Sequence, residues 1–214
     1  MKRFLVSLAF AAGLALPAVA AAQDTPPIRL GLLGGLNFAT LKGNDDEGLK
    51  TRTGLLAGAT MVKPFRSGIG LVIDALYSMR GAKADEDGGS LVTKVDYIEV
   101  PVMLRYDLSS TGNAVPHIGA GVSLAYQTRC RVEASGDGAS ASVNCSALED
   151  EQDITFRRFD VGIVAGAGID FKSGSTTYMI GARYTFGLTD LTNEANLRNR
   201  AFQFFAGVAI PINR

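Results

Sequence analysis

A single histidine and a nearby serine are the residues of this chain best suited to nucleophilic chemistry. His117 is the only histidine among the 214 residues, so a hydrolase built on serine, histidine and an acid would have to use it. Ser123 has the same parity along an alternating segment, which would place both side chains on one face of a strand. At about 3.3 Å per residue, their Cα atoms would be about 20 Å apart. We therefore assign no catalytic residue and predict that the protein is not an enzyme.

The glycine-rich stretch VGIVAGAGIDF (residues 161–171) invites comparison with a phosphate-binding loop. Such a loop places its glycines between a strand and a helix, with backbone N–H groups free to face the anion. Here Gly162, Gly166 and Gly168 share one parity, and a turn at 172–175 leads into another alternating segment. The stretch therefore predicts a strand with little room on one face, and we expect no cofactor.

The two cysteines, Cys130 and Cys145, flank a polar segment in the last half of the chain. Two cysteines and one distant histidine do not form a metal site. Acidic clusters at 45–47, 85–87 and 149–151 lack the ligand spacing of an EF-hand loop, so no metal ligand is assigned. Cysteines of exported chains persist as disulfides, and we predict a Cys130–Cys145 bridge.

Residues 1–22 have the features of a secretory signal peptide. A basic head at Lys2 and Arg3 precedes an apolar run and small residues with A-x-A spacing. Cleavage is expected after Ala20 or Ala22, which leaves residues 23–214 as one domain. Removal of the two basic residues gives this domain a small excess of acids, a composition that does not favour nucleic acid as a partner.

Alternation with a period of two residues recurs along this domain, whereas helical periodicity is rare. In residues 117–127, apolar side chains at even positions alternate with small or polar ones at odd positions. Each alternating segment reaches the about 9–11 residues that a tilted strand needs to cross a bilayer. The predicted strands are 28–40, 51–64, 69–80, 91–108, 114–130, 154–171, 176–188 and 199–213.

The connections between these strands alternate in length. Short turns at 64–68, 109–113 and 172–175 separate longer links at 41–50, 81–90, 131–153 and 189–198. Outer-membrane barrels have short periplasmic turns, long extracellular loops and an apolar outer face. Glycine and alanine opposite the apolar face suit the narrow lumen of eight strands. We predict an all-β fold, an eight-stranded antiparallel transmembrane β-barrel of the up-and-down type; a secreted sandwich or lipocalin-like fold is the alternative.

Two segments resemble a known family. YIEVPVMLRYD (residues 97–107) resembles the Y-[IL]-E-[IV]-P-[ILV]-x-[LI]-[KR]-Y strand of the PorT-like bacterial outer-membrane β-barrel family, and GLLGGLNF (31–38) resembles its opening G-x-x-G-x-N strand. The resemblance implies an eight-stranded barrel in the bacterial outer membrane and no defined activity. One departure is the ending IPINR, where many outer-membrane proteins have an aromatic residue that the assembly machinery reads; Phe202 and Phe204 offer an alternative signal.

Charged residues also have the parity of the lumen face. Buried charges must be paired, since isolated ones are costly, so we predict an interior ion-pair network that plugs the barrel. The alternative is a path for protons or ions. The predicted lumen residues are Asp74, Arg80, Glu99, Arg105, Arg158, Asp160, Asp170 and Arg183.

These features predict an outer-membrane protein with a filled lumen that acts as an envelope anchor, a structural protein or an interaction protein through its long extracellular loops. Its expected partners are outer-membrane lipid (lipopolysaccharide or phospholipid), the outer-membrane assembly machinery and an unidentified partner of the loops. The alternatives are a lipid-modifying outer-membrane enzyme and a small pore or ligand-binding barrel.

Overall fold

The computed structural model describes residues 26–43, 48–86, 89–109, 111–136, 139–147, 157–191 and 197–212. The predicted signal peptide, residues 1–22, lies outside them. Among the described residues, no helix is long and apolar enough to span a membrane. The strands are β1 (Ile28–Gly43), β2 (Leu49–Pro64), β3 (Ile69–Glu86), β4 (Gly89–Asp107), β5 (Ala114–Gly136), β6 (Ala139–Asn144), β7 (Phe159–Ser173), β8 (Thr176–Asp190) and β9 (Leu197–Ile212).

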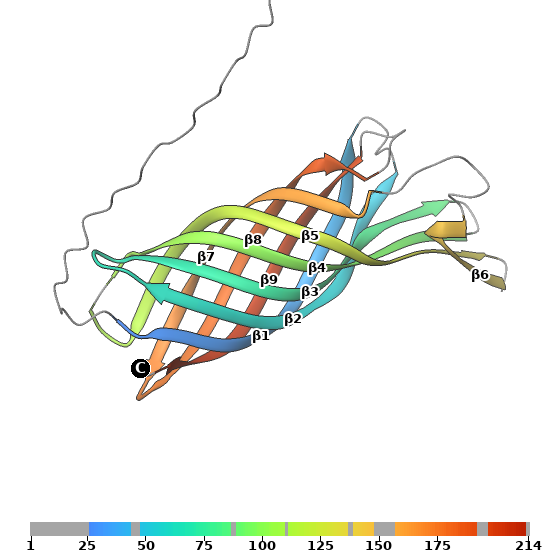
Figure 1. Ribbon diagram of the computed structural model, residues 1–214. Helices are drawn as coiled ribbons and strands as arrows, with labels where there is room; N and C mark the ends of the chain where they lie inside the picture. The colour runs from blue at the N-terminus through green and yellow to red at the C-terminus, as the bar shows by residue number, and fades with distance from the viewer. Residues whose placement is uncertain are drawn as a thin grey trace, which may run out of the picture.

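Eight of these strands close into a barrel (Figure 1). Each pairs antiparallel with its neighbours in the order β4-β3-β2-β1-β9-β8-β7-β5, and β4 pairs with β5 to complete the ring. The first and last strands meet along most of their length, from Ile28 opposite Ile212 to Gly43 opposite Leu197. The predicted eight-stranded antiparallel barrel is therefore confirmed. The short β6 pairs with β5 beyond this ring.

The outer face of the barrel is apolar and the lumen face is small or polar. On β5, Ile118, Val122 and Leu124 point outward and are 48–52% exposed, whereas Ser123 and Ala125 point inward and are 2% and 4% exposed. A secreted sandwich would bury such aliphatic side chains between its sheets. Aromatic side chains of the kind found at membrane interfaces also point outward: Tyr77, Tyr106, Tyr126, Phe171, Phe186 and Phe202.

Tight turns join the strands at one end of the barrel. Their described residues are 65–68, 108–109, 111–113 and 174–175, as the turn-forming residues predict. Gly68 and Gly174 adopt positive φ values of 75° and 58°, a conformation that side chains with a Cβ rarely tolerate. The end of β9 lies beside the start of β1 at this same end (Figure 1), which corresponds to the periplasmic end of such barrels.

At the opposite end, strands continue through segments that the sequence predicts to be loops. The predicted loop 81–90 holds the paired ends of β3 and β4, and the predicted loop 131–153 holds the end of β5 and all of β6. We call this extension the projecting arm (residues 81–86, 89–95, 130–136 and 139–144). The strand segments at 81–86, 89–90, 131–136 and 139–144 were missed because, beyond the buried Ala82, most of their side chains meet water, so hydrogen bonding continues after the apolar alternation has ended.

The glycine-rich stretch 161–171 lies within β7, and a tight turn follows it, not a helix. A Cβ at Gly166 would lie 2.5 Å from the carbonyl oxygen of Ala182 and 2.7 Å from the Cβ of Arg183 on β8. Glycine therefore allows neighbouring strands to approach closely, and the phosphate-loop interpretation does not apply.

Candidate functional site

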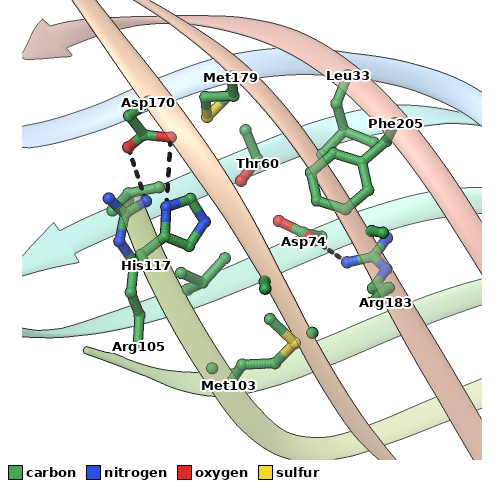
Figure 2. A pocket seen from close by; sticks show the side chains of 16 residues that line it. Leu33, Thr60, Asp74, Met103, Arg105, His117, Asp170, Met179, Arg183 and Phe205 are labelled. Carbon is green, nitrogen blue, oxygen red and sulfur yellow. Dashed lines mark hydrogen bonds and ion pairs between the residues drawn. The ribbon is translucent and has the colours of Figure 1, made fainter. Parts of the chain in front are cut away.

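The middle of the lumen holds two arginines that reach carboxylates on other strands. Arg183 on β8 donates from Nη1 to Oδ2 of Asp74 on β3 at 2.6 Å (Figure 2). Its Nε donates to Gln203 at 2.5 Å. Arg80 on β3 lies 2.5 Å from Oε1 of Glu99 on β4. These four charged side chains are at most 2% exposed. Each buried charge therefore has an opposite charge that offsets its desolvation.

Toward the projecting arm, neutral polar groups extend this network around Asp160. Nη1 of Arg80 lies 3.9 Å from Oδ2 of Asp160, which also accepts a hydrogen bond from Asn199 at 2.7 Å. Thr189 donates to the other oxygen of Asp160 at 2.6 Å. The Asn199 amide also donates to the Tyr97 hydroxyl at 3.1 Å. The network therefore spans the lumen from β3 to β9.

A second charge cluster lies near the turn end of the lumen. Arg105 on β4 contacts Asp170 at 2.7 Å and Asp107 at 2.6 Å. Arg29 approaches the same Asp170 at 3.8 Å, and Nδ1 of His117 lies 3.9 Å from its other oxygen (Figure 2). Asp170 is therefore the shared acceptor of this cluster.

His117 and Ser123, the residues considered for hydrolase chemistry, belong to different clusters. Ser123 donates its hydroxyl proton to Glu99 at 2.7 Å, whereas His117 faces Asp170. No nucleophile and base are therefore within hydrogen-bond reach of each other at this pair. Within the described ranges, no group of three or more His, Cys, Asp or Glu side chains is arranged to hold a metal ion.

A cavity of about 40 Å³ separates the two charge clusters. Asp74 and Arg183 form one wall, and Arg105, His117 and Asp170 form the other (Figure 2). This volume accommodates about three water molecules and no larger solute. The apolar side chains that line the same cavity are Leu33, Val62, Val72, Met103, Ala167, Met179, Ala182 and Phe205.

Apolar side chains close the lumen at the arm end. Leu41, Ala82 and Leu191 form a buried cluster, and Leu49 and Leu197 pack against it. Together with the charge clusters, this layer fills the interior, as expected for a barrel of eight strands.

The structure places seven of the eight predicted lumen residues inside the barrel: Asp74, Arg80, Glu99, Arg105, Asp160, Asp170 and Arg183. The prediction for Arg158 is wrong, because its side chain is exposed. Residues 154–156 of the predicted strand 154–171 lie outside the described residues, and β7 begins at Phe159. The chain bends at 158, where the Arg158 carbonyl accepts a hydrogen bond from the Gln127 N–H at 2.7 Å. The alternation of inward and outward residues was extended to a position before the start of β7, so Arg158 was wrongly assigned to the lumen.

Sequence reasoning missed several residues that complete the clusters. Gln203 links Arg183 to Glu99, since its amide nitrogen lies 3.3 Å from Oε2 of Glu99. Gln203 lies between the outward-facing Phe202 and Phe204, so the alternation predicts that it faces the lumen. It was not selected because only charged residues were considered as members of the network. Arg29 and Asp107 lie next to strand ends, where charge is ordinarily assigned to solvent.

The projecting arm carries exposed ion pairs. Lys94 on β4 contacts Glu133 on β5 at 2.6 Å, and Asp85 on β3 contacts Lys83 at 2.8 Å and Lys50 at 3.0 Å. The hydrogen bond from Lys94 holds the pKa of Glu133 below its usual value. Hydrogen bonds from Lys83 and then Lys50 lower the pKa of Asp85 in the same way.

The predicted disulfide is confirmed. Cys130 on β5 is bonded to Cys145, which directly follows β6, and their Cα atoms are 5.4 Å apart. The bond therefore closes the β5–β6 hairpin at its base.

Comparison with known proteins identifies the family. A family described as outer membrane protein beta-barrel domain matches residues 21–193. The chain belongs to this family. A barrel with an apolar outer wall and this membership place the protein in the bacterial outer membrane. No curated protein sequence matches the chain.

Solved structures of other proteins are similar to the chain at low sequence identity. Neisserial surface protein A is 14% identical with a TM-score of 0.51, over 86% of this chain and 97% of that one. Ail of Yersinia pestis is 11% identical with a TM-score of 0.44, over 87% and 100%. Outer Membrane Protein W of E. coli is 16% identical with a TM-score of 0.41, over 85% and 97%.

Proposed function

We propose that this barrel is an envelope anchor that presents the projecting arm to a partner outside the cell. The observation that carries the proposal is the free edge of β6. Among the described strands, β6 pairs with β5 alone, and all six of its residues, ASASVN, are exposed. Natural sheets protect exposed edges with charged residues, proline or bulges, and β6 has no charged residue and no proline.

The arm is built to hold this edge in place. β4 and β5 stay in register to the pair Gly89–Gly136, and the Lys94–Glu133 ion pair joins the same two strands. The Cys130–Cys145 bond ties the far end of β6 back to β5. An edge that is ordered before binding favours addition of an extended peptide segment as a further strand, which main-chain hydrogen bonds would hold.

The filled lumen supports an anchor over a small pore or a ligand-binding barrel. The cavity between its charge clusters is about 40 Å³, and apolar side chains cover the arm end. A lipid-modifying enzyme would need a nucleophile beside a base, and His117 has no such neighbour among the residues described.

We also assign the chain to the PorT-like branch of its family, on the strand YIEVPVMLRYD of β4. The outward-facing Phe202 and Phe204 of β9, whose rings meet edge to face at 4.7 Å, are the proposed signal for the outer-membrane assembly machinery.

Photo-crosslinking tests the arm. Benzoylphenylalanine at Ala141, on β6, should form adducts in intact cells in their natural setting. Ser142→Lys adds the protective charge that the edge lacks and should abolish those adducts. Thr111→Lys, an exposed change at the turn end, is the matched control and should leave them unchanged. The proposal fails if wild-type protein yields no adduct, or if the adduct persists in Ser142→Lys.

A further inference from the structure

An open concavity lies where β5 leaves the ring to enter the arm. β5 pairs with β7 as far as Tyr126 opposite Phe159, and with β6 from Arg131 opposite Asn144 onward. The wall between these pairings encloses about 390 Å³. We call it the β5 notch; its lining residues are Tyr126, Gln127, Thr128, Arg129, Cys130, Cys145, Ser146 and Arg158.

The described residues that line the β5 notch include two arginines and no acid. Arg129 and Arg158 are both exposed, and neither guanidinium has a hydrogen bond or ion pair to another described residue. Other arginines at this end are occupied: Arg198 donates to Asp190 at 2.8 Å, and Arg200 donates to the Gly187 carbonyl at 2.8 Å. Two guanidinium groups that have no ion-pair partner among the described residues therefore line one concave surface, an arrangement that favours an anion.

The position of the β5 notch relative to the membrane indicates where that anion comes from. The rings of Tyr126 and Phe159 meet at 5.0 Å and are 40% and 69% exposed on the outer wall, as in an interfacial aromatic girdle. Arg158 directly precedes Phe159, and Arg129 lies three residues beyond Tyr126, about 10 Å along the strand. Both guanidinium groups therefore lie at the level of the lipid headgroups on the arm side.

We propose that the β5 notch binds a phosphate group of an outer-leaflet lipid. The planar guanidinium group matches a phosphate bidentately, which favours arginine over lysine at such sites. The exposed Ser146 supplies a hydroxyl on the opposite wall, and the Cys130–Cys145 bond holds this wall against β5. The site is independent of the β6 edge and adds a lipid contact to the proposed interaction role.

The test uses full-length mature protein in phosphatidylcholine nanodiscs that contain bisphosphorylated lipid A, with retained lipid A counted by native mass spectrometry. The double variant Arg129→Gln/Arg158→Gln should retain lipid A about tenfold less than wild type. Arg66→Gln removes an exposed arginine at the turn end and should match wild type. Heat-modifiable gel migration verifies that each variant is folded.

Dephosphorylated lipid A should bind wild type as weakly as the double variant binds lipid A. Equal retention of lipid A by folded wild type and the folded double variant would overturn the proposal. Full displacement by millimolar inorganic phosphate would identify a site for free anions and overturn the assignment to lipid. Neither result would bear on the β6 edge, which the crosslinking experiment tests separately.

Discussion

The lumen and the projecting arm both join strands with ion pairs, but in opposite surroundings. Arg80 and Glu99 meet at 2.5 Å with side chains 1% and 0% exposed. Lys94 and Glu133 meet at 2.6 Å with side chains 37% and 36% exposed. Nearly equal distances therefore correspond to different energetic roles, because water and salt screen the arm pair and not the lumen pair.

The difference follows from what remains when one partner is removed. In the lumen, the surviving charge is buried with no water to replace its partner, so deletion is costly even where the intact pair adds little. On the arm, water solvates the survivor. The lumen ion pairs are therefore needed for the stability of the folded barrel. The arm ion pairs add little to a structure that the disulfide and the hydrogen bonds between strands already stabilise.

The largest effect is expected for Glu99→Ala. This change leaves Arg80 without its closest carboxylate and Ser123 without an acceptor, which should lower the free energy of unfolding by about 3–5 kcal/mol. Denaturant titration in lipid vesicles measures it. Glu133→Ala removes the same kind of side chain from the arm and should leave barrel unfolding unchanged. A similar decrease in the free energy of unfolding in both variants would contradict the proposed difference between the two regions.

The disulfide should matter to the arm and not to the barrel. Cys130 and Cys145 are 15 residues apart, and closing a loop of that length contributes about 3 kcal/mol in the chain-entropy account. In Cys130→Ser/Cys145→Ser, we expect faster amide exchange along β6 and an unchanged barrel melting temperature. Hydrogen exchange with mass spectrometry resolves both. A fall in the barrel melting temperature would show that the arm is coupled to the barrel.

Glycines test how tightly the barrel wall is packed. A Cβ at Gly121 would collide with the Val102 carbonyl oxygen on β4 and lie 2.7 Å from the Met103 Cα. Gly121→Ala should therefore cost about 1–3 kcal/mol, as overpacking does. At Gly34 the nearest atom, the Leu56 carbonyl oxygen, is 3.8 Å away, so Gly34→Ala should be tolerated. The same unfolding titration ranks the two, and equal stabilities would contradict this account of the glycines.

The smallest effect concerns the pH response of the arm. Lys94 lowers the pKa of Glu133, so this pair stabilises the folded arm above the unfolded-state pKa of about 4.3, and the contribution is lost as pH falls through the lowered pKa. A carbon-13 NMR titration of the Glu133 carboxyl should show that Lys94→Gln moves its pKa upward. An unchanged pKa in that variant would mean that Lys94 does not act on Glu133 in solution.

The sequence predicts the barrel well because lipid and lumen impose opposite requirements on alternate residues. Parity alone places Asp74 and Arg183 inside, and turn formers mark the short connections. The same signal fails for β6, where both faces meet water, and for Arg158, which precedes the true start of β7. The apolar alternation therefore indicates which face of a strand meets lipid, and it ends where both faces meet water.

The alternation of inward and outward residues does not predict which charged side chains pair with each other inside the lumen. Arg183 contacts Asp74, 109 positions away, because closure of the barrel brings β8 across from β3. The tilt and stagger of all eight strands determine this meeting, and no local stretch of sequence encodes them. Sequence therefore predicted the members of the clusters more successfully than their pairings.

Planar-bilayer conductance tests most directly whether the barrel is an anchor with a closed interior. Purified wild-type protein whose folded state is verified by heat-modifiable migration should show no stable open state, because the charge clusters and the apolar layer around Leu41 fill the lumen. A reproducible, long-lived conductance step from the folded protein would contradict the account and favour a pore.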